Sequence, residues 1–477
     1  MIIDLNDNIF EDLKAVAQKT GIEAYVVGGY VRDIFLNRAS KDIDVVVIGD
    51  GIEFAKAFSE YKKIIRDFAI FKNFGTAMVK CQDWEVEFVG ARKESYSRDS
   101  RKPRVSPGSL KEDQSRRDFT INALGISLNE ADFGQLLDPF GGLDDLNNQI
   151  LRTPLEPGIT FDDDPLRMMR AIRFASQLNF QILPETFQSI CEHKERIRIV
   201  SFERIIEELN KIILSSKPSI GLQLLFESGL LEIIFPELYA MHGVEYVNGK
   251  GHKDNFYHSL QVLDQGAEET HDLWLRWALL LHDIGKPLTK RYLPQEGWTF
   301  HGHEDKGSRM ISRIFRKLKL PLNEKMKYVE KLVALHHRPK ALAEDGVTDS
   351  AIRRLIVDAG DDLNDLFVLC RADMTTKNTD KLKKYRANLQ KVRELVTEVE
   401  ERDALRNWQP PLTGEDIMKY FAIEPSKIVG IIKEEIRESI LEGKIKNDRK
   451  AAIELMKELG EIHQLKAAGI ELKESMD

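Results

Sequence analysis

The stretch Tyr25–Gly49, YVVGGYVRDIFLNRASKDIDVVVIG, decides the fold that we expect for the first part of this 477-residue chain. Its first three residues read as a short buried strand. The glycine pair Gly28-Gly29 then permits a turn in which the backbone approaches a ligand closely. Val31–Asn37 reads as a helix, and Lys41–Ile48 reads as a second strand whose apolar end indicates burial on both faces.

Two carboxylates on this second strand are the first candidates for chemistry. Asp42 and Asp44 are two residues apart, so the alternation of side chains along a strand points both to the same face. Carboxylates held side by side repel each other and are costly unless a cation lies between them. A hard divalent cation such as Mg²⁺, which binds carboxylates together with substrate phosphates, is the expected occupant.

A third carboxylate follows farther along the chain. Thr76–Cys81 and Trp84–Val89 read as strands joined by a tight turn. On the second of these strands, Glu85 and Glu87 share the face opposite to the apolar side chains. Glu87 either joins the two aspartates or faces solvent, and the pattern leaves both alternatives open.

The totals describe an ordinary soluble protein of several domains, with 42% hydrophobic and 31% charged residues. No run of about 18 apolar residues occurs and Met1–Asn8 has no basic residue, so we expect no membrane span, no signal peptide and a cytoplasmic location. The three cysteines match no disulfide or zinc spacing. A net charge of −8 argues against a generally basic nucleic-acid-coating protein but allows a local basic groove.

The most basic stretch is 92–117, where nine basic residues face four acidic ones. Its prolines, glycine and serines predict a mobile loop, which is either a solvated surface loop or, as the segment that follows favours, a flexible element near a polyanion. The loop runs into Ser115–Gly125, SRRDFTINALG, in which paired arginines precede an apolar helix start and suit phosphate binding. From about residue 150 the pattern becomes helical.

Phe161–Leu178, FDDDPLRMMRAIRFASQL, reads as one helix with an acidic first turn. Its arginines recur every three residues and therefore predict a stripe along one face, which suits phosphates or base edges. Asp164 and Arg167 are predicted to share that face. Ser201–Leu209, SFERIIEEL, begins the next helix with Ser201 as its N-cap.

Nine of the eleven histidines lie between His242 and His337. The pair His282-Asp283 ends a strongly apolar helix, where unpaired polar groups would be expensive. Histidine nitrogens with aspartate oxygens are suitable ligands for borderline divalent metals, so we expect a metal site here. After about residue 376 the chain reads as helical and is interrupted by Pro410 and Pro411, which suggests a module that packs or contacts RNA.

Taken together, these segments resemble the tRNA nucleotidyltransferases of the bacterial and eukaryotic type, the CCA-adding enzymes of the polymerase-beta-like superfamily. GGYVRD with DID looks like the metal motif of that family, RRDFTINAL its ribose and phosphate motif, DPFGG its hinge, DDDPLRMMRAIRFA its nucleotide-selecting motif and SFERIIEEL its neck motif. One departure is visible, because the selecting motif usually begins with Glu-Asp where this chain has Asp163-Asp164. We expect no change of class from this difference of one methylene.

The resemblance implies an α+β chain whose mixed-sheet head is followed by helical parts. A nucleotidyltransferase head would span 1–150, and an all-α neck with nucleotide-selecting and RNA-binding motifs would span 151–235. An HD domain of the metal-dependent phosphohydrolase type would span 236–376. A helical tRNA-binding or packing region would span 377–477.

The activity implied by the resemblance is stepwise addition of C, C and A from CTP and ATP to the 3′ end of tRNA, without a nucleic-acid template. Asp42 and Asp44 would hold two Mg²⁺ ions, one activating the 3′-hydroxyl and one steadying the triphosphate as pyrophosphate leaves. Asp164 and Arg167 would pair with the Watson–Crick edge of cytosine or adenine. The implied nucleotide-binding residues are Gly28, Gly29, Arg32, Arg117, Asp164, Arg167 and Arg170.

The second domain resembles the HD phosphohydrolase superfamily. Its four-residue signature would be His258, His282, Asp283 and Asp373, holding a divalent metal whose identity stays open. His303 with His336 or His337 would complete an additional metal position. In some CCA-adding enzymes such a domain hydrolyses phosphomonoesters or 2′,3′-cyclic phosphates, which would serve the repair of damaged tRNA ends.

Four rivals remain beside this interpretation. A poly(A) polymerase shares head and neck but usually has a longer basic C-terminal region, whereas this tail is mixed in charge. A CC-only enzyme would lack the loop that residues 92–115 supply. A nucleotide-signal synthetase/hydrolase has its HD domain first, and a non-catalytic RNA-binding protein would not need both aspartates. The oligomeric state stays open.

Overall fold

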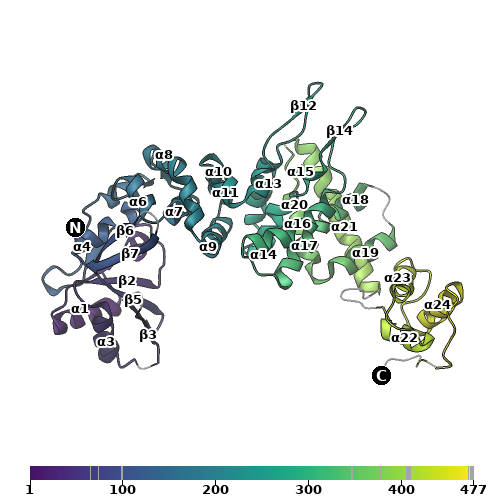
Figure 1. Cartoon of the computed structure of the whole chain (residues 1–477), viewed down its shortest axis with the longest axis horizontal. Helices are drawn as coiled ribbons and strands as arrows, with labels where there is room; N and C mark the ends of the chain where they lie inside the picture. The colour runs from purple at the N-terminus through teal and green to yellow at the C-terminus, as the bar shows by residue number, and fades with distance from the viewer. Residues whose placement is uncertain are drawn as a thin grey trace. The chain divides into compact units, whose positions relative to one another are not determined.

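The structure is a computed structural model that describes residues 1–64, 66–72, 75–97, 100–344, 348–376, 378–403, 410–470 and 472. The chain forms two compact units, Met1–His242 with Lys317–Leu320 and Gly243–Arg316 with Pro321–Asp477. Figure 1 shows the large sheet in the first unit and a mainly helical second unit. The α+β class with a mixed-sheet head and helical parts is therefore confirmed.

Seven strands of the first unit form a mixed sheet in the order β3-β4-β5-β2-β1-β8-β9 within the described part of the chain. The β2–β5 pair is parallel, and the other neighbours are antiparallel. The strands are β1 (Ala24–Val27), β2 (Asp42–Val47), β3 (Phe68–Phe71), β4 (Thr76–Cys81), β5 (Trp84–Gly90), β8 (Gly125–Ser127) and β9 (Leu136–Leu137).

Helices α1 (Asn8–Thr20) and α3 (Gly51–Lys62) cover one face of this sheet. Phe54 and Phe58 of α3 pack against Phe88 of β5, with ring centroids 5.7 and 5.5 Å apart. Since side chains alternate along a strand, the neighbour Glu87 faces the other side. The apolar core on the α3 side thus fixes which face of the sheet carries the carboxylates.

The basic stretch 92–117 is not a loop, and that prediction was wrong for its described residues. Strands β6 (Arg92–Ser97) and β7 (Ser100–Pro107) pair in a separate antiparallel sheet, and α4 (Leu110–Ser115) follows. Ser109 and Glu112 cap α4 by exchanging hydrogen bonds with each other's backbone N–H. The polar composition suggested a loop because the two strands pair through their backbone, which composition does not report.

The predicted helix Phe161–Leu178 is broken. Helix α6 (Pro157–Asp163) ends at Asp163, and the next residue, Asp164, is extended with φ −138° and ψ 100°. Pro165 causes this break because its ring excludes the helical conformation from the preceding residue. The rest of the helical part consists of α5 (Gly142–Asn147), α7 (Leu166–Leu178), α8 (Pro184–His193), α9 (Phe202–Ile213), α10 (Pro218–Glu227), α11 (Leu230–Ile234) and α12 (Pro236–Tyr239), with the short strands β10 (Ile150–Leu151) and β11 (Gln181–Ile182).

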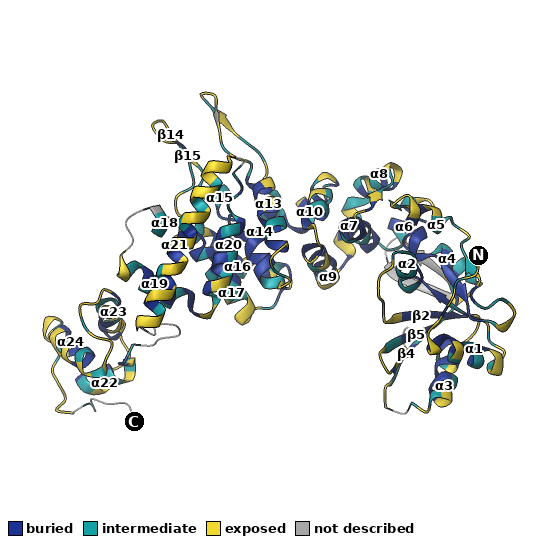
Figure 2. Ribbon diagram, turned by 180° about the vertical axis from the view of Figure 1, so that it is seen from behind, coloured by how far each residue is buried: buried dark blue, intermediate teal, exposed yellow. Residues whose placement is uncertain are grey.

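The second unit is built around α14 (Leu273–Leu281), whose residues from Leu275 onward are all buried (Figure 2). It packs against α13, α17 and α20. The other helices are α13 (Asn255–Ala267), α15 (Lys286–Thr289), α16 (His303–Lys317), α17 (Glu324–Leu335), α18 (Arg338–Glu344), α19 (Asp349–Ala359), α20 (Leu363–Ala372) and α21 (Thr379–Asp403). Two small hairpins are β12 (Tyr246–Val247) with β13 (Lys250–Gly251), and β14 (Arg291–Leu293) with β15 (Gly297–Thr299).

The last three helices, α22 (Gly414–Phe421), α23 (Lys427–Leu441) and α24 (Arg449–Ile462), share a hydrophobic core of their own. Thr413 caps α22. Ion pairs to α19 join this module to the unit, with Arg354 to Glu438 and Arg437 to Asp358 both at 2.7 Å. None of the helices in the described ranges is long and apolar enough to cross a membrane.

Candidate functional site

The two aspartates predicted from the sequence lie on β2 beside a third carboxylate. Asp44 is in register with Glu87 on the parallel neighbour β5, and Asp42 is in register with Glu85. Residues in register on neighbouring strands point to the same face. Asp42 and Glu87 are exposed and Asp44 is half-buried. This face of the sheet therefore offers a group of carboxylates that a ligand can reach.

The charged form of the Asp44 carboxylate is destabilised in this arrangement. Burial raises its pKa and outweighs Arg117, which lowers it, while Asp42 raises it further. Desolvation and the Asp44 carboxylate also raise the pKa of Glu87. A cation between the carboxylates relieves both effects, and an oxygen-only ligand set fits Mg²⁺.

Gly28 lies directly against this carboxylate. Its φ is +79°, and a Cβ at this position would lie 2.9 Å from a guanidinium nitrogen of Arg117 and 3.3 Å from Oδ2 of Asp44. Gly28 is also the N-cap of α2 (Gly29–Phe35). The turn therefore brings bare backbone into contact with Asp44 and Arg117, a position that only glycine fills without strain.

Two of the predicted arginines are fixed near this turn by other side chains. The buried Asp113 pairs with Arg117 at 3.3 Å. Arg32, from α2, donates a hydrogen bond of 2.8 Å to Oδ1 of Asn122. Arg117 also donates to the backbone oxygen of Asn122, at 3.4 Å. Arg32 and Arg117 thus meet at Asn122 although 85 positions separate them in the sequence.

Arg170 joins the same group through Asp118. Oδ1 of Asp118 accepts a hydrogen bond from Asn122 at 3.0 Å, and Oδ2 accepts one from Arg170 at 2.7 Å. Burial raises the pKa of Asp118, but Arg170 and the hydrogen bonds outweigh burial and lower it to about 2. The guanidinium groups of Arg32 and Arg170 lie 5.2 and 5.4 Å from the Phe174 ring centroid. Attraction between each cation and this ring helps to hold both arginines.

Asp164 and Arg167 do not share a helix face, so that prediction was wrong. Asp164 precedes α7, caps it with one oxygen, and pairs through the other with Arg204 at 3.4 Å. Arg167 is only 9% exposed and donates a 2.5 Å hydrogen bond to the backbone oxygen of Arg116. The helix break at Pro165 leaves Asp164 before α7 and Arg167 inside it, and Arg204 comes from the predicted neck helix α9.

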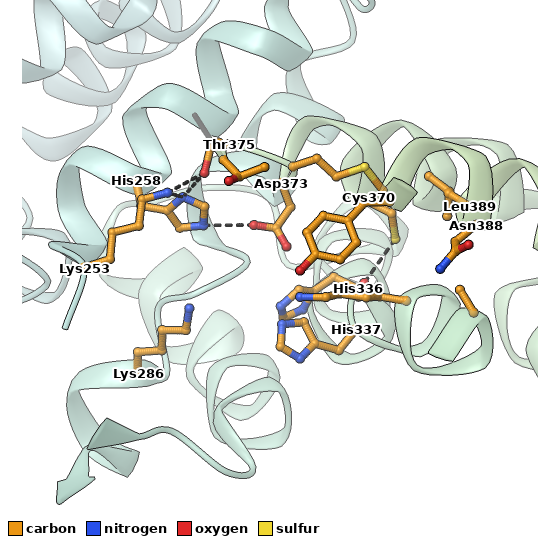
Figure 3. Close-up of a pocket in the computed structure, with 15 residues that line it drawn as sticks. Lys253, His258, Lys286, His336, His337, Cys370, Asp373, Thr375, Asn388 and Leu389 are labelled. Carbon is orange, nitrogen blue, oxygen red and sulfur yellow. Dashed lines mark hydrogen bonds and ion pairs between the residues drawn. The ribbon is translucent and has the colours of Figure 1, made fainter. Parts of the chain in front are cut away.

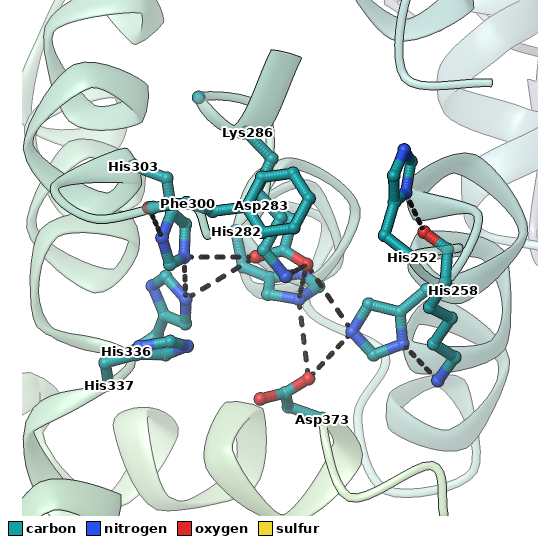
Figure 4. A network of polar contacts seen from close by, with 12 residues as sticks. His252, His258, His282, Asp283, Lys286, Phe300, His303, His336, His337 and Asp373 are labelled. Carbon is teal, nitrogen blue, oxygen red and sulfur yellow. Dashed lines mark hydrogen bonds and ion pairs between the residues drawn. The ribbon is translucent and has the colours of Figure 1, made fainter. Parts of the chain in front are cut away.

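The second unit gathers histidines and aspartates at the ends of helices (Figure 4). These residues are His258 in α13, His282 and Asp283 after α14, His303 at the start of α16, His336 and His337 after α17, and Asp373 after α20. Gly285 permits the close approach, because a Cβ there would lie 2.2 Å from the backbone oxygen of His303.

The four residues predicted from the sequence lie together. Nε2 of His258 lies 2.9 Å from Oδ1 of Asp373 and 3.5 Å from Oδ2 of Asp283. Nε2 of His282 lies 3.3 Å from Oδ2 of Asp283 and 3.6 Å from Oδ1 of Asp373. Two nitrogens and two oxygens thus converge from three helices, which is a donor set for a borderline divalent metal.

The charges in this cluster follow from burial and from the two carboxylates. Burial lowers the pKa of His282, but Asp283 and Asp373 raise it, with a net value of about 10. Burial raises the pKa of Asp283, but His282 and Lys286 hold it well below its usual range. Burial keeps the pKa of His336 well below its usual value. The carboxylates of Asp283 and Asp373 therefore favour the protonated form of His282. His336 stays neutral, which is the form in which imidazole binds metals.

A pocket of about 310 Å³ opens onto this cluster. Figure 3 shows lysine and histidine side chains around it. Lys286 pairs with Asp283 at 2.5 Å, and Lys253 lies 3.0 Å from Nδ1 of His258. Burial lowers the pKa of Lys253, an effect that Asp373 opposes. The lining residues that bear on function are Lys253, Lys286, Lys340, His258, His337, Asp373 and Tyr385. Lysines beside a metal-ligand cluster suit a phosphate group.

Three protein families match the chain. "Poly A polymerase head domain" matches residues 24–152, "Probable RNA and SrmB- binding site of polymerase A" matches 179–241, and "HD domain" matches 255–378. With the carboxylates on the head sheet and the histidine cluster, these matches define a class. The chain is a nucleotidyltransferase head followed by an RNA-binding segment and an HD domain.

Similar curated proteins show to which family within this class the chain belongs. The chain is 35% identical over 316 residues to the "Multifunctional CCA protein" of Mannheimia succiniciproducens, covering 63% of this chain and 71% of that protein. It is 47% identical over 165 residues to the "A-adding tRNA nucleotidyltransferase" of Aquifex aeolicus, covering 35% of this chain and 20% of that protein. The chain belongs to the family of multifunctional CCA proteins, the CCA-adding tRNA nucleotidyltransferases with an HD domain, as its motifs predicted.

Solved structures share the fold. A "tRNA nucleotidyltransferase complexed with a primer tRNA and an incoming ATP analog" matches with a TM-score of 0.54 at 25% identity, over 80% of this chain and 99% of that chain. The Bacillus stearothermophilus CCA-adding enzyme in complex with CTP matches with a TM-score of 0.62 at 21% identity, over 96% and 99%. Those relatives bind tRNA, an ATP analogue and CTP.

The sequence did not indicate several residues that hold the arginine side chains of the site in place. Asp118 and Asn122 lie inside the motif RRDFTINAL, yet nothing in the motif indicates that they hold Arg170 and Arg32, which are 52 and 90 positions away. Asp113 and Phe174 were missed for the same reason. Their signal is contact between distant segments, which only the fold supplies.

Proposed function

We propose that the head of this chain adds C, C and A stepwise from CTP and ATP to the 3′ end of tRNA, with Asp42 and Asp44 as its metal-binding catalytic residues. The single observation that supports this most is the geometry at Asp44. This carboxylate lies on the same accessible sheet face as Asp42, and a Cβ added at Gly28 would lie 3.3 Å from it and 2.9 Å from Arg117. Metal ligands and phosphate-binding groups therefore meet at one point.

Mg²⁺ bound at Asp42 and Asp44 would neutralise the triphosphate and activate the 3′-hydroxyl. The oxygen of that hydroxyl attacks the α-phosphorus, and the bond to the leaving pyrophosphate breaks. The bare backbone of Gly28 and Gly29 leaves room for the triphosphate. Arg117, held by Asp113, and Arg32, held by Asn122, supply positive charge without having to reorganise.

We propose that Asp164 and Arg167 select the base, with Arg170 in support. Arg167 donates to the backbone oxygen of Arg116, so it would exchange this partner for a base edge when a nucleotide enters. Arg204 would hold Asp164 in place meanwhile, since the two already pair. A guanidinium and a carboxylate together can match the donors and acceptors of cytosine or adenine.

We propose that His258, His282, Asp283 and Asp373 bind a divalent metal and that the HD domain hydrolyses phosphate esters. The lysines around the pocket support a phosphate-bearing substrate. A tRNA whose 3′ end carries a phosphate is the substrate that best links this domain to the head.

We also propose that the four parts of the chain are a head, a neck, an HD domain and a helical tail that contacts tRNA. We propose the cytoplasm as the place where the protein acts.

The test of the head uses two tRNA substrates, one ending at the discriminator base and one ending in CC, with CTP and ATP alone and together. We expect the first to gain C, C and A and then to stop, and the second to gain one A. Addition of A to the CC-ending tRNA alone would favour the A-adding activity of the Aquifex aeolicus relative. A long A tract would favour a poly(A) polymerase, and a halt after CC a CC-only enzyme.

The test of the head residues is substitution of each aspartate. Asp42→Ala and Asp44→Ala should each abolish incorporation while tRNA binding survives. Asp83→Ala, in the exposed turn between β4 and β5, is the matched control and should incorporate normally. Retained activity in either of the first two variants would refute the metal assignment.

A further inference from the structure

Two short hairpins lie beside the HD pocket, because Lys253 follows β13, Lys286 precedes β14, and both lysines line that pocket. Strand β13 of the first hairpin contacts β15 of the second, and Figure 1 shows both hairpins on the same side of the unit. Each hairpin has a defined turn. Asn248-Gly249, both with positive φ, join the first pair of strands, and Gly297 with φ +87° follows the loop of the second. A substrate that extends out of the pocket would therefore meet side chains held on a fixed backbone.

Aromatic rings cover the place where the two hairpins meet. His252 contacts Trp298 with ring centroids 5.3 Å apart, and it contacts Phe300 at 5.6 Å. Tyr292 contacts Trp298 at 5.4 Å. Nε2 of His252 also accepts a hydrogen bond of 3.4 Å from the backbone N–H of Glu245. The four rings are half-buried, so neighbouring side chains fix them while part of each stays accessible.

Tyr246 adds a ring that is 73% exposed and nevertheless held in place. It pairs across the first hairpin with Gly251, where an added Cβ would lie only 2.6 Å from Cε1 of the Tyr246 ring. One face of the ring therefore lies on bare backbone, a contact that a side chain at position 251 would prevent. The large exposed fraction leaves the other face accessible to a ligand. Because the ring is already ordered, a flat group that stacks on it costs little conformational entropy.

Lysines accompany these rings. Lys286 lies 5.6 Å from the centroid of Phe300, and Lys290 lies 5.0 Å from that of Trp298. Lys286 also pairs with Asp283, so the surface is continuous with the pocket (Figure 4). Rings that alternate with cations are typical of surfaces that bind single-stranded nucleic acid, where bases stack on the rings and phosphates lie near the cations. A duplex would not fit in this way, because its bases already stack on one another.

We propose that the surface of hairpins β12–β13 and β14–β15 binds the last nucleotides of a single-stranded RNA 3′ end, with Tyr246 and Trp298 as its stacking residues. This inference rests on the proposed hydrolysis of phosphate esters by the HD domain and names the class of ester. The terminal phosphate would enter the pocket beside Lys253 and Lys286, and the preceding bases would stack on the hairpin rings. The single-stranded 3′ end of a tRNA can reach such a surface.

The first test locates RNA on the chain without relying on hydrolysis. A short single-stranded RNA carries a 3′-phosphate and a photoreactive 4-thiouridine at its penultimate position. It is irradiated with the full chain in the presence of a chelator, and the crosslinked peptides are identified by mass spectrometry. We expect crosslinks within residues 244–252 and 291–300. Crosslinks confined to other parts of the chain, or none, would overturn the proposal.

The second test measures what the rings contribute to substrate binding. KM is compared for an RNA trinucleotide with a 3′-phosphate and for a nucleoside 3′-monophosphate, which has no preceding base to stack. In the unsubstituted chain, KM should be lower for the trinucleotide. Tyr246→Ala and Trp298→Ala should each raise the trinucleotide KM by about tenfold, the effect of one lost stacking contact. Tyr246→Phe and Trp298→Phe keep a ring and should retain the lower KM.

Trp274→Ala is the matched control, because Trp274 is another half-buried tryptophan of this unit with a lysine, Lys325, 5.3 Å from its ring centroid. It should keep the lower trinucleotide KM. Equal KM values for the two esters in the unsubstituted chain, or an unchanged trinucleotide KM in Tyr246→Ala and Trp298→Ala, would overturn the surface and leave the hydrolytic function standing. If neither ester is hydrolysed, the proposed HD activity fails, and the crosslinks still decide whether the hairpins bind RNA. Tyr246 is exposed, so Tyr246→Ala keeps the test decisive even if Trp298→Ala does not fold.

Discussion

Position 28 shows how the lack of a side chain contributes to a site. Gly28 adopts φ +79°, and a Cβ added there would lie 2.9 Å from Arg117 and 3.3 Å from Asp44. An added methyl group would push on the guanidinium and on the carboxylate at the same time. Displacement of catalytic groups by about 1 Å costs roughly 100-fold in rate, so the effect of one methyl group here should be large.

The first prediction is that Gly28→Ala lowers nucleotidyl transfer to tRNA by about 100-fold while the head stays folded. Gly21→Ala is the matched control, because Gly21 has φ +67° and no atom within 4 Å of an added Cβ. Both residues have a positive φ, Gly21 in the left-handed helical region with ψ 18° and Gly28 with ψ −135°, and only Gly28→Ala crowds the site. The measurement is the single-turnover rate together with the melting temperature. Equal rates in the two variants would contradict the role of Gly28.

Glu87 poses a second question at this scale, because it is exposed yet in register with Asp44. If it helps to hold Mg²⁺, Glu87→Gln should raise the Mg²⁺ concentration for half-maximal transfer by about tenfold, since losing a supporting ligand costs 10–100-fold in metal affinity. Glu85→Gln, on the same face of β5, is the control and should leave the requirement unchanged. A Mg²⁺ titration of both variants decides the matter, and identical curves would place Glu87 in solvent.

At the scale of helices and strands, the features that depend only on residues close together in the sequence were predicted correctly. The alternation in β2 placed Asp42 and Asp44 on one face, and the tight turn at Gln82-Asp83 separated β4 from β5 as expected. Gly21, with φ +67°, caps the C-terminus of α1. These features need only the period of a strand and the conformational freedom of glycine.

Elements that depend on distant partners were not predictable in the same way. The hairpin β6–β7 reads as a loop because its composition is polar, and the pairing of the two strands, from Arg92 with Pro107 to Ser97 with Ser100, makes it a sheet. Because the helix breaks at Pro165, the arginines predicted to form a stripe have different partners from one another. Arg167 contacts backbone oxygens, and Arg173 pairs with Glu208 at 2.5 Å instead of facing a ligand. Arg170 pairs with Asp118 of the RRDFTINAL motif, at 2.6 Å.

Helix α21 has an uneven distribution of charge that the helix itself does not favour. Between Lys381 and Arg393 it carries six basic residues and no acidic one, and the acidic residues then follow from Glu394. Cations near a helix N-terminus oppose its dipole, so this order does not stabilise the helix. Arg386 and Arg393 line a groove of about 410 Å³ beside α20. This half of α21 is the part of the tail that we expect to contact tRNA.

The third prediction tests this surface. Arg386→Ala/Arg393→Ala should weaken tRNA binding and reduce the slope of log K against log salt by about 1 to 2, because each lost phosphate contact removes roughly 0.7–0.9. Arg313→Ala/Arg316→Ala on α16 removes two other exposed arginines and is the control. The measurement is tRNA affinity at several salt concentrations. An unchanged slope in the first variant would exclude α21 from the tRNA surface.

At the scale of the whole molecule, the two candidate centres lie in different compact units and need different chemistry. The head needs a free 3′-hydroxyl as its nucleophile, and a tRNA that ends in a 3′-phosphate does not offer one. The HD domain would supply it: water attacks the phosphorus, the bond to the 3′ oxygen breaks, and that oxygen takes up a proton while inorganic phosphate leaves. One chain would thus prepare an end in one unit and extend it in the other.

The fourth prediction separates the two steps with tRNA that carries either a 3′-hydroxyl or a 3′-phosphate. The unsubstituted chain, loaded with Mn²⁺ and supplied with Mg²⁺, CTP and ATP, should extend both substrates. His282→Ala/Asp283→Ala should extend only the hydroxyl-ended tRNA, because these residues are proposed to hold the metal on which removal of the phosphate depends. Asp42→Ala/Asp44→Ala should release phosphate and extend neither.

Mixing the two variants should restore extension of the phosphate-ended tRNA, since the dephosphorylated product can leave one chain and bind the next. Extension is followed by gel electrophoresis, and free phosphate is measured in parallel. Extension of the phosphate-ended tRNA by His282→Ala/Asp283→Ala alone would remove the HD centre from this sequence of steps. If the mixture fails although Asp42→Ala/Asp44→Ala releases phosphate, the product passes between the centres of one chain without dissociating. The two-step order would then hold, and exchange of the product between chains would be excluded.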